Sequence, residues 1–356
     1  MNVFSYDLLI IGSAAPALQA LGAARYPGKI AVLADSDTAK TPAASGEMNA
    51  RLLMETGCFH SDPALVRVLC DEAGKQTEHA PAHADALPGC ALRLYAKNNQ
   101  IQGALGFDRG QFFLVAAPRI LLCGGENGSA LTMAYYAGAR LADLEFQFQG
   151  HPLGGMIIDA EGCATVRGLY AAGCWCAGLH GAAYQAPVAA AAEEVFACRA
   201  ARNIAATQMQ AGVDLSALES WGEETAHVGA ARIADSIGEI RRECAPAAEQ
   251  LRFPYDEAML ETALQAVSHA QHELNELPPA APEEAFLRLR EEDWLIALRL
   301  HVFSAMERRD TLGCFVRGDY PNGAAAPYRV CMGLQGLLLW PEKEAWPPQH
   351  DARNEA

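Results

Sequence analysis

The stretch "DLLIIGSAAPALQAL", Asp7 to Leu21, decides the fold. Its apolar start, residues 7–11, predicts a buried parallel strand, and the small residues after it lead into a predicted helix from Ala15 to Arg25. A second apolar strand is expected over "KIAVLAD", Lys29 to Asp35. Together they make one β-α-β unit of about 30 residues, the size of a dinucleotide-binding unit. The sequence therefore predicts an α/β fold built on a parallel sheet.

The turn of this unit departs from the G-x-G-x-x-G pattern that commonly holds a diphosphate. Gly12 is present, but Ala14 and Ala17 stand where the other two glycines are expected, with Pro16 between them. The second glycine lets the backbone approach the diphosphate, so the methyl group of Ala14 weakens that contact. Gly12 still permits the tight turn, and free N–H groups at a helix N-terminus still attract an anion. These residues leave open whether the turn binds a nucleotide.

Composition narrows the possible partners. The chain has 356 residues, which is room for two domains, and a formal net charge of -16. That charge argues against a nucleic-acid or anionic-membrane partner. The runs "LLII" and "GLLLW" are too short to span a bilayer, and we find no secretory signal, so we expect a cytoplasmic protein. The eleven cysteines are expected to be free thiols, and the pair Cys174 and Cys176 is interpreted as packing beside a turn, not as a metal site.

The rest of the chain predicts more strands and then helices. A helix is expected over residues 62–75, a connector over 79–88, and a β-meander over 90–123 that ends in a Gly-Gly turn. Beyond it we expect an Ala-rich helix over 187–210 and a long amphipathic helix over 285–309. The tail from Trp340 is expected to be loose.

Six runs along the chain, taken in order, resemble the motifs of one protein family. They are "DLLIIGSAAPAL", "SGEMNA" (Ser45 to Ala50), "ILLCGG", "AYYAGARLADLEF" (Ala134 to Phe146), "HPLGGMIIDAEGCATVRGLYAAG" with "GLHGA" (His151 to Ala182), and "RRDTLGCFVRGDYP" (Arg308 to Pro321). In this order they resemble the FAD-dependent flavoprotein subunits of succinate dehydrogenase and fumarate reductase, together with L-aspartate oxidase and adenylylsulfate reductase.

The resemblance implies a Rossmann-like FAD-binding domain with a parallel sheet and a β-meander over residues 1–208, followed by a helical domain over 209–325. Residues 326–356 would form a C-terminal strand and a loose tail. The family inserts a capping domain that closes over the substrate. Here the two insertion points, near residues 76–92 and 147–151, are nearly empty. The chain is therefore expected to be a shortened member that lacks the cap.

The resemblance also implies a noncovalent FAD site, because Lys40 falls near the place where some members carry a flavin-linking histidine. The residues placed against the FAD are Gly12, Ser13, Ala14, Ala15, Asp35, Ser45, Gly46, Gly124, Gly125, Gly173, Cys174, His180 and Gly181. His151 is a weak catalytic candidate, next to the substrate or a flavin carbonyl. The alternative is a core histidine that donates to a backbone carbonyl.

Residues that contact the substrate or the cofactor in the family are mostly replaced here, whereas the glycines of its turns are kept. The replacements are Ala34 for the ribose-binding acid, Ser45-Gly46-Glu47 for Gln-Gly-Gly, Cys174 for Glu, Tyr184 for the substrate-clamping Arg, Val188-Ala189-Ala190 for Asn-Ser-Leu, and Leu312 and Phe315 for Arg and His. Arg317, Asp319 and Pro321 of the last motif remain. The pattern predicts that dicarboxylate chemistry is lost and that FAD binding is weak or lost.

Three functions therefore stay open. The chain is a degenerate, non-catalytic component of a redox complex, or an active FAD-dependent oxidoreductase that exchanges hydride with a small substrate and passes electrons to a partner. Binding of a bare nucleotide in the FAD cleft is a minor third possibility. Loss of the cap should uncover apolar surface around residues 48–53 and 153–157, so we expect a homo-oligomer or a complex with a larger redox subunit.

Overall fold

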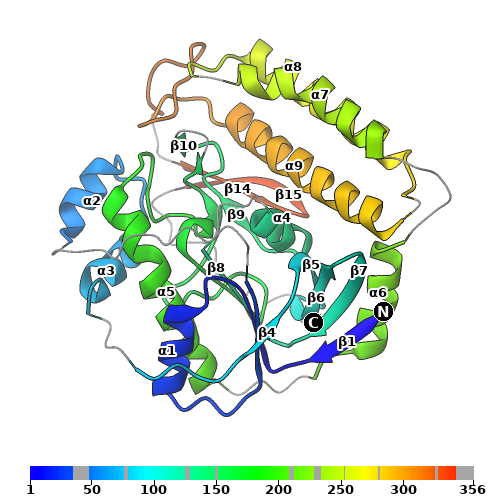
Figure 1. Cartoon of the computed structure of the whole chain (residues 1–356). Helices are drawn as coiled ribbons and strands as arrows, with labels where there is room; N and C mark the ends of the chain where they lie inside the picture. The colour runs from blue at the N-terminus through cyan, green and yellow to red at the C-terminus, as the bar shows by residue number, and fades with distance from the viewer. Residues whose placement is uncertain are drawn as a thin grey trace, which may run out of the picture.

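A computed structural model gives the fold (Figure 1). It describes residues 1–34, 48–75, 79–124, 129–148, 151–207, 212–227, 234–251, 253–279, 281–324 and 328–341. The predicted domain boundaries at residues 208 and 325 fall outside these ranges, and so does the predicted loose tail from residue 342 onward.

A five-stranded parallel sheet forms the centre of the N-terminal half. Its order is β13 (Leu169–Ala172), β8 (Ile120–Cys123), β2 (Leu8–Gly12), β3 (Ile30–Leu33) and β4 (Asp85–Leu87). The predicted pairing of the first two apolar strands is confirmed, because the register sets residue 8 beside residue 30. Strands β13, β8, β2 and β3 are short and apolar on both faces, as buried parallel strands are, whereas β4 at the edge of the sheet is mostly exposed. Strand β4 lies in the segment that the sequence predicted to be only a connector. It was missed because the Ala- and Pro-rich sequence of this segment carries no strand pattern.

Helices α1 (Ala15–Ala23) and α5 (Ala186–Ala206) pack side by side against this sheet (Figure 1). Helix α3 (Pro63–Glu72) is the helix predicted over residues 62–75, and it begins where the sequence placed it because the Asp62 side chain accepts from two backbone N–H groups of its first turn. Helix α2 (Ala50–Thr56) was not predicted.

The β-meander is present as a second sheet. Strands β5 (Cys90–Lys97), β6 (Gln100–Asp108) and β7 (Gln111–Ala116) are antiparallel, and the unpredicted strand β1 (Asn2–Ser5) adds to β7 in parallel. Leu92, Leu105 and Leu114 of this sheet pack against Leu218 and Leu289 from the C-terminal helices. The meander is therefore covered by helices that come from the other end of the chain.

The C-terminal half is helical, as the sequence predicted. Helices α6 (Leu215–Thr225), α7 (Ala234–Gln250), α8 (Glu257–Asn275) and α9 (Pro282–Glu307) follow one another, and α9 packs on both α7 and α8 (Figure 1). The amphipathic pattern expected for α9 is wrong, because this helix is enclosed on several sides. It buries the polar residues Glu291, Asp293, His301 and Ser304 as well as its apolar ones.

A third, four-stranded sheet joins the two halves. Its order is β12 (Gly155–Met156), β9 (Leu141–Ala142), β14 (Tyr328–Gly333) and β15 (Gly336–Pro341). Strand β14 pairs antiparallel with β9, so the end of the described chain returns to the middle of the sequence. Strand β15 runs to Pro341, slightly beyond the point where the loose tail was expected to begin.

The positions where a capping domain would enter hold only short connections. Strands β10 (Gln147–Phe148) and β11 (His151–Pro152) pair antiparallel with two residues between them. The apolar surface expected at residues 153–157 is absent, because Leu153, Met156 and Ile157 are buried and β12 is packed against the chain at Trp175. In the other expected segment Leu52 is 61% exposed.

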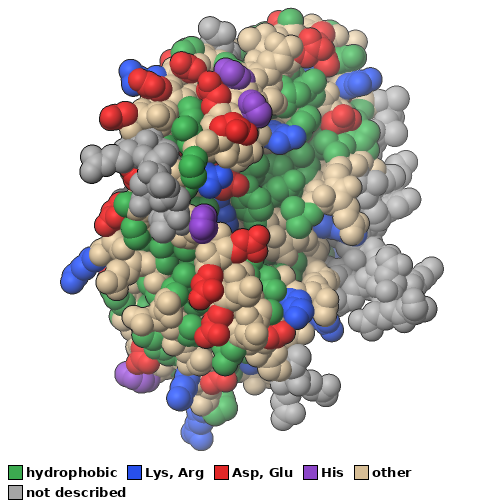
Figure 2. Space-filling view, turned by 90° about the vertical axis from the view of Figure 1, so that its right-hand side faces the viewer, with side chains coloured by type: hydrophobic (Ala, Val, Ile, Leu, Met, Phe, Trp, Pro, Cys, Tyr) green, Lys and Arg blue, Asp and Glu red, His purple; other side chains and the backbone are tan. Residues whose placement is uncertain are grey.

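The surface carries both signs of charge. Figure 2 shows one face on which acidic and basic side chains are interspersed among apolar ones, without a single basic patch. All eleven cysteines are free, as predicted. None of the described helices combines the length and the apolar sequence needed to cross a bilayer.

Candidate functional site

Three glycines converge at the carboxyl end of the parallel sheet, where ligands bind in folds of this kind. Gly12 ends β2, Gly124 follows β8, and Gly173 follows β13. Their φ angles are +99°, +56° and +85°, which favour glycine over residues with a side chain. A Cβ on Gly12 would lie 2.0 Å from the carbonyl oxygen of Cys123, so the turn tolerates no larger residue there. We call these three residues the glycine cradle.

Backbone contacts close the cradle on itself. The N–H of Ser13 donates to the Cys123 carbonyl at 3.0 Å, and the N–H of Gly124 donates to the Ala172 carbonyl at 3.4 Å. A cradle that binds a diphosphate offers such N–H groups to the phosphate oxygens. These two groups already have partners within the protein.

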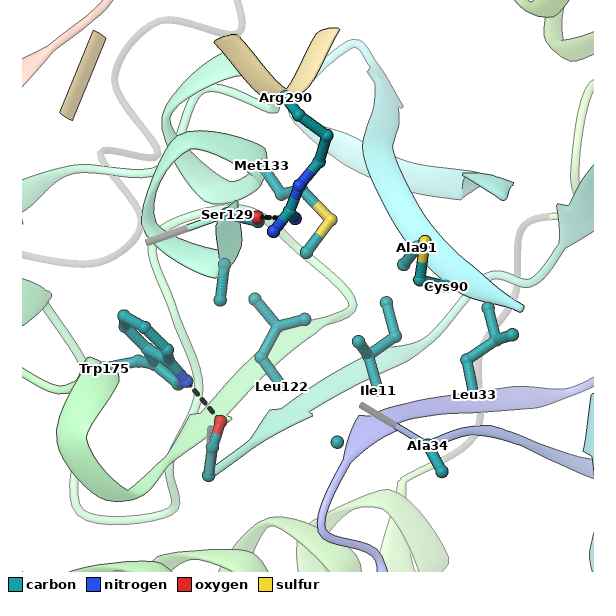
Figure 3. A pocket seen from close by; sticks show the side chains of 13 residues that line it. Ile11, Leu33, Ala34, Cys90, Ala91, Leu122, Ser129, Met133, Trp175 and Arg290 are labelled. Atoms are coloured by element: carbon teal, nitrogen blue, oxygen red, sulfur yellow. Dashed lines mark hydrogen bonds between the residues drawn. The ribbon is translucent and has the colours of Figure 1, made fainter. Parts of the chain in front are cut away.

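A cavity of about 30 Å³ lies beside the cradle at the ends of β2, β3 and β8 (Figure 3). The Trp175 indole closes one side and donates its Nε1–H to the Gly124 carbonyl. From above in this view, Arg290 reaches in from α9 and donates to Ser129 Oγ, at the start of α4 (Ser129–Tyr136). Apolar side chains such as Ile11 make up most of the remaining wall.

Two features of the described residues bear on whether an FAD fits here, the volume of the cavity and the side chain at position 34. Pockets for ligands of drug size measure roughly 300–1,000 Å³, whereas 30 Å³ is about the volume share of one water molecule in the liquid. The side chain at position 34, where an acid would hold the ribose, is the methyl group of an alanine. We therefore assign no chemical step to a flavin in this chain.

Glu193 of α5 lies against two of the cradle glycines. Its carboxylate oxygens lie 2.7 and 3.2 Å from the place of a Cβ on Gly124, and its own Cβ lies 3.4 Å from the place of a Cβ on Gly173. Burial, and then the nearby Glu193 charge, raises the pKa of the Cys123 thiol well above its ordinary value. Cys123 is therefore an inert, protonated thiol.

The structure brings several of the predicted cofactor residues together. Gly12, Ser13, Gly124 and Gly173 meet at the cradle, and Ala14 and Ala15 begin α1 beside it, with Ala14 in the capping position. Cys174 is exposed in the short 3-10 turn η1 (Gly173–Trp175). Four predicted residues, Asp35, Ser45, Gly46 and Gly125, lie outside the described residues, as does the replaced Lys40. The backbone of His151 lies in β11, and its side chain is outside the description.

His180 and Gly181 lie together in a second turn. The His180 ring is buried, its Nδ1 accepts from the backbone N–H of Gln185 at 3.1 Å, and burial lowers its pKa to about 4. Tyr184 stacks on this ring on one side and on Phe148 on the other, with centroid distances of 5.4 and 4.7 Å. Tyr184, which the resemblance in sequence aligns with a substrate-clamping arginine, is therefore held between two rings and offers no positive charge.

A buried charged group, missed in the sequence, ties the segment after β9 to β14. Asp143 accepts from Arg329 Nη1 at 2.6 Å and lies 3.1 Å from His60 Nε2. Burial alone would raise the pKa of Asp143, but the charges of Arg329 and His60 outweigh it and lower the pKa to about 2. The group stabilises the junction of distant segments and lies among core residues, not at the cradle.

Trp175, Glu193 and Arg290 at the cradle were also missed. Each comes from a different part of the chain, so no local spacing connects them. Glu193 alone carries a signal, since it and Glu194 directly follow the apolar run "APVAAAA" in α5.

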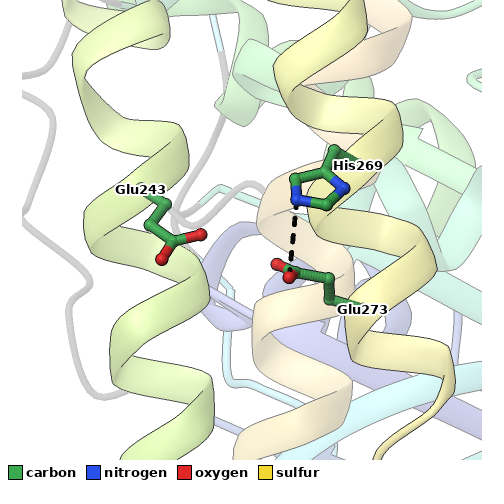
Figure 4. Close-up of side chains that lie close together, drawn as sticks. All are labelled: Glu243, His269 and Glu273. Atoms are coloured by element: carbon green, nitrogen blue, oxygen red, sulfur yellow. Dashed lines mark ion pairs between the residues drawn. The ribbon is translucent and has the colours of Figure 1, made fainter.

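One cluster has the composition of a metal site. Glu243 of α7 and His269 and Glu273 of α8 place their ligand atoms within 4.8 Å of one another (Figure 4). His269 Nε2 and Glu273 Oε1 are 3.4 Å apart. Glu243 and His269 are exposed, and Glu273 is partly buried. Such groups are typical of the solvated face of paired helices, so we assign no metal to it.

The chain resembles known proteins in its structure but matches none by sequence comparison. Neither a scan against protein-family models nor a search of curated proteins finds a match. Solved structures do match over nearly their whole length. The Sdh1 complex of Mycobacterium smegmatis gives a TM-score of 0.80 at 14% identity, covering 98% of this chain and 96% of that chain.

Two further matches belong to other enzymes. FrdA of the quinol fumarate reductase of E. coli gives a TM-score of 0.79 at 12% identity, over 98% of this chain and 99% of that one. Adenylylsulfate reductase from Archaeoglobus fulgidus gives 0.71 at 13% identity, over 97% of each chain. The chain therefore has the fold of the flavoprotein subunits of succinate dehydrogenase, fumarate reductase and adenylylsulfate reductase. The resemblance predicted from the sequence motifs is confirmed at the level of the fold.

Proposed function

We propose that this chain is a flavoprotein-type subunit that keeps the scaffold of its fold, has lost dicarboxylate chemistry, and binds FAD weakly or not at all. The observation that carries the proposal is the closed glycine cradle. Its turns keep the positive φ angles of a nucleotide-binding fold, while two of its N–H groups bond to the protein itself and the adjoining cavity measures about 30 Å³.

The state of the substrate side supports the same proposal. Binding a dicarboxylate requires positive charge, commonly a bidentate arginine. Tyr184 stands at the position of that arginine, packed between His180 and Phe148. The two-residue connection between β10 and β11 leaves no domain there to exclude water from a reaction.

A role within an assembly follows from this proposal. A subunit without its own chemistry acts by holding or positioning another protein. Here we infer a second copy of the chain or a larger redox subunit as the partner. Support comes from the similarity to subunits such as those of the Sdh1 complex, and from the exposure of Leu52, Phe59, Phe148 and Tyr184.

Two measurements test the proposal. The absorption spectrum of the purified protein between about 350 and 500 nm should show no stoichiometric flavin. Assays with succinate, fumarate and aspartate, coupled to artificial electron carriers, should give no rate above the blank, while quinol fumarate reductase assayed in parallel gives a clear rate. A bound flavin at one per chain, or a robust rate with any of the three substrates, would refute it.

A further inference from the structure

Glu193 is a charged residue in an unusual position. It lies in the partly buried stretch of α5 that packs on the cradle, and its side chain crosses from Gly173 to Gly124. Helix α5 also contacts the start of α1, because Cys198 Sγ donates to the Pro16 carbonyl at 3.4 Å. Glu193 lies five residues earlier, or about 7.5 Å along the helix axis. Its carboxylate lies against Gly124, which follows β8 at the edge of the sheet where this kind of fold receives a diphosphate.

The carboxylate has no counter-charge in the part of the chain that the structure describes, where it makes no hydrogen bond or ion pair. Arg290 lines the cavity beside the cradle, and its guanidinium donates to Ser129 Oγ and not to Glu193. Two like charges a few ångströms apart repel strongly where water is partly excluded. A diphosphate that settled on the cradle would lie beside the Glu193 carboxylate.

We propose that Glu193 is the residue that excludes diphosphate-containing nucleotides from the glycine cradle. The inference rests on the proposed function, and it identifies Glu193 as the group that weakens the binding of FAD. It differs from a steric account, because a charge acts on the phosphates of FAD and ADP and leaves riboflavin and adenosine unaffected.

The test is a titration of the full chain with four probes: FAD, ADP, riboflavin and adenosine. Flavin fluorescence quenching follows the first and third probes, and calorimetry follows the other two. Glu193→Gln removes the charge at nearly constant shape. Glu194→Gln, one residue further along α5, is the matched control because it makes the same change in net charge. Circular dichroism establishes whether each variant is folded. If Glu193→Gln does not fold, Glu193→Ala takes its place in the titrations.

Glu193→Gln should bind FAD and ADP about tenfold or more tightly than the unmodified chain. The gain should shrink at about 1 M salt, because salt screens charge repulsion. Riboflavin and adenosine affinities should not change, and Glu194→Gln should change none of the four. An equal gain for all probes, no gain for FAD and ADP, or weaker binding in Glu193→Gln would each overturn the inference. Tight FAD binding by the unmodified chain would instead refute the proposed function itself.

Discussion

Asp143 is held by charges that come from both ends of the chain. Its carboxylate bonds to Arg329 and lies beside His60, and the side chains of all three are almost fully buried. Removal of one partner of a buried pair leaves the other charge uncompensated. We therefore expect Asp143→Asn to lower the free energy of unfolding by about 3–5 kcal/mol. Denaturant unfolding followed by circular dichroism measures this, and a loss under about 1 kcal/mol would contradict it.

The same group predicts a dependence on pH. The folded-state pKa of Asp143 is about 2, below the ordinary value of 3.8. Its contribution to stability is therefore complete above about pH 4 and is lost as the pH falls toward 2. Unfolding curves of the unmodified chain and of Asp143→Asn, recorded at intervals between pH 7 and pH 2, should converge at the acid end. A difference in the free energy of unfolding that stays constant over this range would show that the Asp143 carboxylate does not cause the pH dependence.

His180 predicts acid sensitivity in a different range. Burial lowers its pKa from 6.5 to about 4, so the folded state keeps the ring neutral. As the pH falls from 6.5, the unfolded chain binds a proton before the folded chain does, and the free energy of unfolding decreases until about pH 4. Urea unfolding of His180→Gln should show a shallower decline in this range. Equal slopes for the two proteins would contradict the assignment.

At the scale of the element, the turn after β2 depends on Gly12. A Cβ there would lie 2.0 Å from the Cys123 carbonyl, at a φ of +99°. We expect Gly12→Ala to destabilise the fold by about 3 kcal/mol or more. Gly238→Ala is the matched control, because nothing lies within 4 Å of its added Cβ in the exposed face of α7. That change should stabilise the protein by up to about 1 kcal/mol, and thermal melting compares the two.

The elements also show what the sequence can predict. The unit from β2 through α1 to β3 carries its own periodicity, so the strands and their pairing followed from a short stretch. Strand β4 and helix α2 were missed because their stability comes from neighbours in the fold and not from local sequence. The polar residues of α9 are buried by tertiary contacts, which no helical period encodes.

The residues of the candidate site also fall into two groups, those that the sequence could predict and those that it could not. Gly12 was predicted from the G-x-G-x-x-G pattern, and Gly124 and Gly173 from the resemblance to the family; their positive φ angles show why glycine stands there. Glu193 and Arg290 reach the crevice from helices far along the chain, and their positions follow only from the packing of α5 and α9. The residues that build the turn were therefore predictable, while those that decide what the crevice accepts were not.

At the scale of the whole molecule, the exposed apolar side chains predict association. Leu52 and Phe59 are 61% and 62% exposed, and Phe148 and Tyr184 lie near 40%. The acidic remainder of the surface should keep the assembly soluble. Light scattering of the purified chain should give a mass of at least two copies, or the chain should co-purify with a larger redox subunit from its native extract. A monomer that captures no partner under both conditions would contradict this.

Strand β14 also sets an order of events during protein synthesis. Arg329 and Asp143 are 186 residues apart in the sequence. Ribosomes add about 5–20 residues per second, so the acid emerges roughly 10–40 s before the arginine that neutralises it. Through that interval His60 is the only one of the two partners of Asp143 already synthesised, and β9 lacks its pairing with β14. The parallel sheet can assemble on the ribosome, but the junction of the two halves can close only after the C-terminal strand is released.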